Sequence, residues 1–172
     1  MLRGVLLLVV LGACAGLGFQ RAGADARRLS QLLMLNRTAR IISQEIETAR
    51  TPLPEAFCRA AGRVEEPFTS WLMEMARELG AYDRESFAKV FRDKTRQYLS
   101  DTQLTAQDLR EWEEAGIMLG YPDIQVQTGA LSLYLAENER TAAALREELP
   151  ARRKLFRSLG VLGGVFLMIL FW

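Results

Sequence analysis

The sequence predicts an all-α protein, a bundle of about five to six helices flanked by a transmembrane helix at each end. Apolar residues recur at intervals of three and four through the middle of the chain, which is typical of amphipathic helices. Strand-like alternation appears only over residues 131–135, between helical flanks. Both ends are apolar, and residues 4–19 and 159–172 contain no charged side chain. We therefore divide the chain into a transmembrane helix over residues 1–19, a helical bundle domain over residues 20–158 and a second transmembrane helix over residues 159–172.

The two uncharged ends are short for membrane helices but long enough to span. At about 1.5 Å per residue, residues 4–19 and 159–172 would extend roughly 24 Å and 21 Å, against a hydrocarbon layer of about 30 Å. Lys and Arg residues near the spans lie almost entirely on the side of the middle segment, with Arg3 alone on the other side. Because basic residues concentrate on the cytoplasmic side of a membrane, we expect residues 20–158 in the cytoplasm and both termini outside.

The first apolar run has an alternative interpretation as an export signal. Arg3, the apolar residues 5–11 and the small residues after them are typical of a secretory signal. Residues 11–14, Leu-Gly-Ala-Cys, also resemble a bacterial lipoprotein cleavage box. In this alternative the chain is an exported helical binding domain anchored by lipid at Cys14, although the basic cluster at residues 21–28 would hinder export.

Each predicted span contains two glycines four residues apart, Gly12 with Gly16 and Gly160 with Gly164. In a membrane this spacing lets two helix backbones approach closely. In the hairpin orientation both pairs lie towards the cytoplasmic end of their spans, at matching depth. We therefore predict that these four glycines pack the two spans together.

The middle segment begins with a helix that continues from the membrane to about residue 49, followed by a short helix. Thr51 is positioned as the N-cap of the short helix, with Pro52 at its first helical position and Gly62 at its end. Cys58 follows an inward-facing aromatic residue in this helix. We expect its thiol to be buried or half-buried.

The rest of the middle segment predicts four more helices, each with a start signal. These starts are Glu66-Pro67, Asp83, Thr105 and Asp123. Thr105 is the sharpest signal, because Asp108 follows it at capping-box spacing and leucines occupy the two staple positions. The last helix runs on into the C-terminal span and contains Pro150, where we expect a kink.

Composition restricts the function more by what is missing than by what is present. The 22 basic and 21 acidic residues are balanced, whereas a nucleic-acid-binding surface gains from a basic surplus. The absence of histidine excludes His-dependent nucleophiles and His metal ligands. Neighbouring carboxylates are spaced as on solvated helix faces, and no phosphate loop or cysteine zinc site is present. We therefore predict a protein that is not an enzyme, needs no cofactor or metal, and does not bind nucleic acid.

Charge divides the middle segment into three parts. Residues 64–139 contain seven basic and fifteen acidic side chains, whereas residues 20–63 contain eight and four, and residues 140–158 contain six and two. The basic parts next to the membrane suit anionic lipid headgroups. The acidic body is typical of a solvated surface, with a basic protein partner as the alternative.

Four short stretches, in order and spacing, resemble the stage III sporulation protein AB family of endospore-forming bacteria. They are Glu45-Ile46, Thr51-Pro52-Leu53 with Ala56, Leu119-Gly120 with Asp123 and Gln127, and Ser158-Leu159-Gly160 with Gly163-Gly164. Each stretch is unspecific, but the ordered set is specific, and it extends over almost the whole chain.

The resemblance implies a component of the mother-cell transenvelope channel complex that links mother cell and forespore, made from the stage III operon. The family's soluble domain resembles the cytoplasmic domains of the type II secretion platform protein. By that likeness, the chain would couple the operon's secretion-type ATPase to the membrane channel, with other stage III proteins and membrane lipids as further partners. The candidate partner surface comprises Pro52, Leu53, Asp123 and Gln127.

Overall fold

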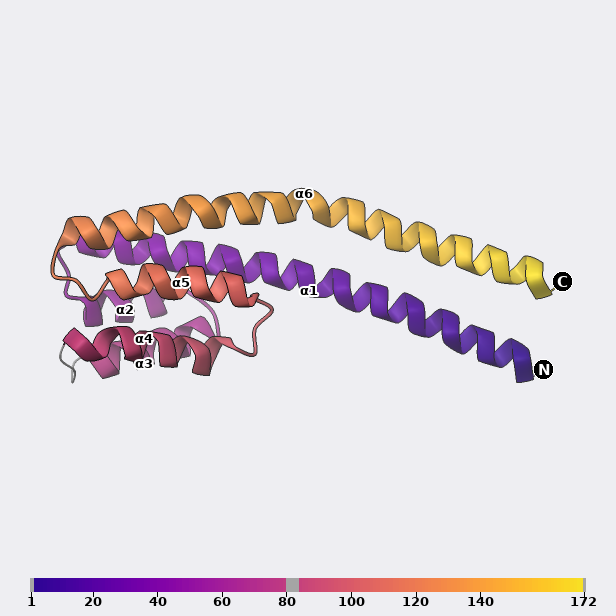
Figure 1. Cartoon of the computed structure of the whole chain (residues 1–172), viewed down its shortest axis with the longest axis horizontal. Helices are drawn as coiled ribbons and strands as arrows, with labels where there is room; N and C mark the ends of the chain where they lie inside the picture. The colour runs from indigo at the N-terminus through magenta and orange to yellow at the C-terminus, as the bar shows by residue number, and fades with distance from the viewer. Residues whose placement is uncertain (1, 80–83, 172) are drawn as a thin grey trace. The chain divides into compact units, whose positions relative to one another are not determined.

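The computed structural model describes the backbone of residues 2–79 and 84–171, and the side chains of residues 23–79 and 87–151. Within these ranges the chain is helical and contains no strand, which confirms the predicted all-α class (Figure 1). The helices are α1 (Leu2–Glu47), α2 (Leu53–Ala61), α3 (Phe68–Leu79), α4 (Arg84–Leu99), α5 (Ala106–Met118) and α6 (Ile124–Phe171).

The chain forms two compact units. One unit comprises Met1–Leu29 and Ala143–Trp172, and the other comprises Ser30–Ala142. In the first unit the backbones of α1 and α6 are helical over residues 2–19 and 159–171 of the predicted spans, and α6 continues through Pro150. The side chains of both spans, including all four glycines predicted to pack together, lie outside the described residues, so their packing stays a prediction.

Among residues 23–79 and 87–151, no helix is both long enough and apolar enough to cross a membrane. The two predicted spans, residues 4–19 and 159–172, lie outside these ranges and stay predictions.

The core of the Ser30–Ala142 unit is a chain of buried aromatic rings that joins five helices. Trp71 of α3 lies edge-on to Phe57 of α2, Phe91 of α4 and Trp112 of α5, with ring centroids 6.2, 5.5 and 5.7 Å apart. Trp112 in turn lies 5.0 Å from Tyr134 of α6. Aromatic pairs in these geometries stabilise a core beyond the effect of burying their area. The rings therefore fix α5 and α6 relative to the helices before them.

Two of the predicted helix starts are confirmed by their hydrogen bonds. Thr105 Oγ1 accepts from the Asp108 N–H at 3.2 Å, and Asp108 Oδ2 accepts from the Thr105 N–H at 2.7 Å, which completes the predicted capping box. The Asp123 carboxylate accepts from the Gln125 N–H at 2.8 Å and so caps α6 as predicted. The predicted start at Asp83 lies outside the described residues.

Two predictions for α2 were wrong. The N-cap position belongs to Pro52, without a side-chain cap, because the Thr51 hydroxyl donates instead to Glu45 Oε2 at 3.1 Å. Cys58 is exposed and free, since Phe57 takes the buried position and the next residue points about 100° away around the helix.

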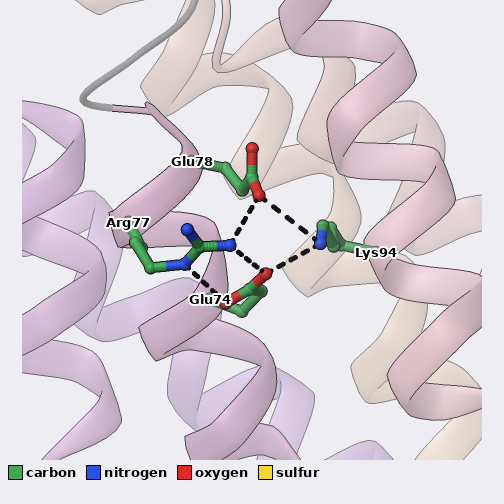
Figure 2. A network of polar contacts seen from close by, with 4 residues as sticks. All are labelled: Glu74, Arg77, Glu78 and Lys94. Atoms are coloured by element: carbon green, nitrogen blue, oxygen red, sulfur yellow. Dashed lines mark hydrogen bonds and ion pairs between the residues drawn. The ribbon is translucent and has the colours of Figure 1, made fainter.

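A surface network of four charges joins α3 to α4 (Figure 2). Lys94 Nζ lies 2.8 Å from Glu74 Oε1 and 3.6 Å from Glu78 Oε1, and Arg77 Nη2 lies 2.8 Å from a carboxylate oxygen of each. Hydrogen bonds from Arg77 and Lys94 to the Glu74 carboxylate lower its pKa to about 2. The two positive and two negative charges balance, and the ion pairs from Lys94 to Glu74 and Glu78 link α4 to α3.

Candidate functional site

Two segments that are far apart in the sequence, residues 46–53 and residues 119–127, meet at one depression of the Ser30–Ala142 unit, about 290 Å³ in volume. It is lined by Ile46 near the end of α1, residues 50–52 before α2, Leu53 at the start of α2, residues 119–122 after α5, and Ile124 and Gln127 in the first turn of α6. We call this depression the corner. It contains residues from three of the four stretches that carry the family resemblance.

The α1–α2 side of the corner is held by the Glu45 carboxylate. Arg50 has a φ of 49°, a left-handed conformation that reverses the chain after α1. The Thr51 N–H then donates to the Glu45 carbonyl at 3.1 Å, while Glu45 Oε2 accepts from Thr51 Oγ1 at 3.1 Å and from Arg59 Nη1 at 2.7 Å. These bonds hold Pro52 in a fixed position at the edge of the depression.

The α5–α6 side of the corner is held by Gln127. Its Nε2 donates to the Leu119 carbonyl at 2.8 Å and to the Tyr121 carbonyl at 2.7 Å. Carbonyl groups at the end of a helix lack partners within the helix, so the buried Gln127 amide satisfies groups that would otherwise be costly to bury. This internal role was missed from the sequence, because no local pattern marks it.

Gly120 is required by close packing. A Cβ atom added there would lie 2.6 Å from Phe87 Cδ1 of α4, well inside van der Waals contact. The preceding Leu119 is fully buried. This end of the corner is therefore packed directly on Phe87, which lies beside Phe91 of the aromatic core.

The candidate partner surface divides into exposed and buried residues. Pro52 and Asp123 are exposed, Leu53 is half-buried, and Gln127 is buried with its amide used inside the chain. Pro52, Leu53 and Gln127 line the corner together. Asp123 does not line it, although both of its neighbours, Pro122 and Ile124, do. Partner binding by these four residues stays a prediction.

Tyr121 is a further candidate that the sequence analysis missed. Its side chain is 53% exposed at the corner. Exposed aromatic side chains in fixed surroundings are frequent anchors of protein interfaces. In the sequence, Tyr121 stands out as an aromatic residue between a glycine and a proline, in the turn between two predicted helices.

The lining of the corner carries little charge. Of its lining residues, which all lie in the described part of the chain, Arg50 is the one that carries a charge. In the same described part, no group of carboxylates and thiols is arranged to hold a metal ion. The lining is a mixture of polar and apolar side chains, with Arg50 as its one cation.

The comparisons with known proteins point to one family. The family model of stage III sporulation protein AB matches residues 3–172. A solved structure of a stage III sporulation protein AB is similar, with a TM-score of 0.64 and 18% sequence identity over 72% of this chain and 97% of that chain. At this identity the likeness shows the fold. No curated protein sequence matches the chain.

Proposed function

Since the chain belongs to the stage III sporulation protein AB family, we propose that it is a non-enzymatic membrane component of the transenvelope channel complex. The chain is thus a stage III sporulation protein. In the proposed role it couples the secretion-type ATPase of the stage III operon to the membrane channel between mother cell and forespore. The resemblance of the family's soluble domain to cytoplasmic domains of the type II secretion platform protein supports this role by analogy.

The observation that carries the proposal is the convergence at the corner. Residues 46–53 and 119–127 are far apart in the sequence, yet they meet around one depression, whose two sides are held by hydrogen bonds of Glu45 and Gln127. Tyr121 and Pro52 remain exposed there. A rigid setting lowers the entropic cost of binding, so an exposed aromatic residue in it is suited to a stable contact with another protein.

The adaptor role predicts that damage to the corner releases a partner without unfolding the chain. We would introduce Tyr121→Asp and purify the full chain in detergent from sporulating cells. Met73→Asp is the matched control, because Met73 is also exposed, at 52%, but lies on α3 away from the corner. The proposal predicts that the stage III ATPase is recovered with the control and lost with Tyr121→Asp. Equal recovery from both variants would contradict it.

In this proposal the two apolar ends anchor the chain in the mother-cell membrane, and the basic segments beside them contact lipid headgroups. The orientation can be tested with Ser100→Cys in a chain that carries Cys14→Ser and Cys58→Ser. Ser100 is exposed, so an impermeant thiol reagent should label it only after the membrane is opened. Labelling of intact cells would contradict the cytoplasmic placement.

The same proposal requires that the first apolar run is retained. An intact-mass measurement of the membrane form should give the uncleaved chain. A mass that corresponds to cleavage before Cys14 with added lipid would instead favour the exported lipoprotein.

Packing of the two spans through Gly12, Gly16, Gly160 and Gly164 can be tested by cross-linking. With the native cysteines replaced, Gly16→Cys with Gly160→Cys should form a disulfide, which requires Cα atoms within about 7 Å. Failure to cross-link in an inserted protein would count against packing within one chain.

A further inference from the structure

A second depression lies between α5 and α6, with a volume of about 450 Å³. Each helix contributes residues at spacings of three and four, from Glu111 to Met118 on α5 and from Ala130 to Glu137 on α6. We call it the α5–α6 groove. It shares no lining residue with the corner, so it is a separate site.

The floor and one wall of the α5–α6 groove are apolar. Ala115 and Tyr134 are buried beneath it, while Met118 is 39% exposed and Leu133 is 75% exposed. Leu133 is the most exposed of the large apolar side chains in the described part of the chain. The groove therefore presents apolar side chains to solvent next to polar groups.

The border of the α5–α6 groove is acidic. Glu111, Glu114 and Glu137 line it, and none of its lining residues, all of them described, is basic. The neighbouring Arg140 lies 3.5 Å from a Glu137 oxygen on the same helix and is itself 80% exposed. Complementary charge favours a basic partner, and like charge disfavours an acidic one.

We propose that the α5–α6 groove binds one amphipathic helix of a partner protein, with apolar residues against Leu133 and Met118 and with Lys or Arg residues against the three carboxylates. An amphipathic helix that lays its apolar face in an apolar groove is a common mode of protein recognition. The body of a second copy matches less well, because residues 64–139 contain fifteen acidic and only seven basic side chains, so a second copy could bind only through its basic residues 20–63 or 140–158. The proposal does not depend on coupling to the ATPase.

The test uses the full chain reconstituted in nanodiscs of zwitterionic lipid, and two fluorescent helical peptides as probes. One peptide has leucines on one face and lysines on the other, and the second has glutamates in place of the lysines. Binding is measured by anisotropy after subtraction of the signal from empty nanodiscs. The lysine peptide should bind at least about tenfold more tightly than the glutamate peptide, with an affinity that falls as salt is added.

Two sets of variants assign the binding to the groove. Leu133→Gln and the pair Glu114→Gln with Glu137→Gln should each weaken binding of the lysine peptide by about tenfold. The matched controls are Leu33→Gln on α1, where Leu33 is 43% exposed, and the pair Glu47→Gln with Glu65→Gln, which are exposed elsewhere. The controls should bind as the unaltered chain does, and circular dichroism should show that every variant is folded.

Three results would overturn the proposal. One is equal binding of the two peptides, and another is unchanged binding after Leu133→Gln. The third is a chain that forms dimers in detergent and becomes monomeric with Leu133→Gln, because the occupant would then be a second copy.

Discussion

The side-chain amide of Gln127, in the first turn of α6, donates a hydrogen bond to the backbone carbonyl of Leu119 at the end of α5, at 2.8 Å. The same nitrogen also donates to the Tyr121 carbonyl at 2.7 Å. One side chain therefore closes the connection between two helices, and it fixes the shape of the corner at which the family-like stretches meet.

Replacement of this amide should destabilise the chain. Gln127→Ala leaves two carbonyls without their donor, and we expect the free energy of unfolding to fall by about 1–3 kcal/mol. Urea unfolding of the full chain in detergent measures it. Gln125→Ala is the control, because Gln125 is exposed two residues earlier in the same helix. Equal midpoints for the two variants would show that the amide is dispensable.

Removal of the Asp123 cap of α6 should lower the free energy of unfolding by less than Gln127→Ala does. Asp123 accepts from the Gln125 N–H, so Asp123→Ala should cost about 1 kcal/mol of stability, whereas Asp123→Asn or Asp123→Ser should cost much less. The conservative variants are the controls within the same unfolding measurement. Loss of stability with Asp123→Asn equal to that with Asp123→Ala would exclude capping as the role of this side chain.

The helices and their caps could be predicted because the signals are local. The capping box of Thr105 and Asp108, and the cap at Asp123, depend on residues within three positions of one another. The Cys58 thiol was expected to be buried or half-buried and is exposed, because helical spacing alone does not decide which of two adjacent positions reaches the core.

The corner could not be predicted as a site, because residues 46–53 and 119–127 meet only in the fold, and the bonds within each segment follow no local pattern. Thr51 was predicted to cap α2, but its hydroxyl bonds to Glu45, which only the reversal at Arg50 brings near. Likewise Gln127 reaches Leu119 across a turn whose path no sequence pattern specifies. The resemblance drew attention to these stretches, and only the fold shows that they meet.

Two glycines should respond to alanine with opposite signs. A Cβ atom at Gly116 in α5 would lie 2.0 Å from Phe91 Cε1, so Gly116→Ala should destabilise the chain by about 1–3 kcal/mol through overpacking. A Cβ atom at Gly129 in α6 would meet nothing within 4 Å. Gly129→Ala should therefore stabilise the chain by about 0.5–1 kcal/mol through helix propensity. Thermal unfolding of both variants checks the prediction, and the same sign for both would contradict it.

The charge network between α3 and α4 should make stability sensitive to acid. The Glu74 carboxylate, bonded by Arg77 and Lys94, has its pKa lowered from the ordinary 4.5 to about 2. A group with a lowered folded-state pKa stabilises the fold above its ordinary pKa, and that stabilisation is lost as the pH falls through the folded-state value. Unfolding measured from pH 5 to pH 2 should show a shallower loss of stability for Glu74→Gln than for the unaltered chain. Glu47→Gln, an exposed carboxylate outside the network, should leave the slope unchanged.

If the chain works by holding a partner at the corner, photo-cross-linking in sporulating cells should capture that partner at position 121. Tyr121 would be replaced by p-benzoylphenylalanine, and Met73 would be replaced in the same way as the control on α3. After irradiation, we expect a covalent adduct between the chain and the stage III secretion-type ATPase from position 121 and none from position 73. No adduct from position 121 in a folded, membrane-associated chain, or the ATPase adduct from position 73 instead, would contradict it.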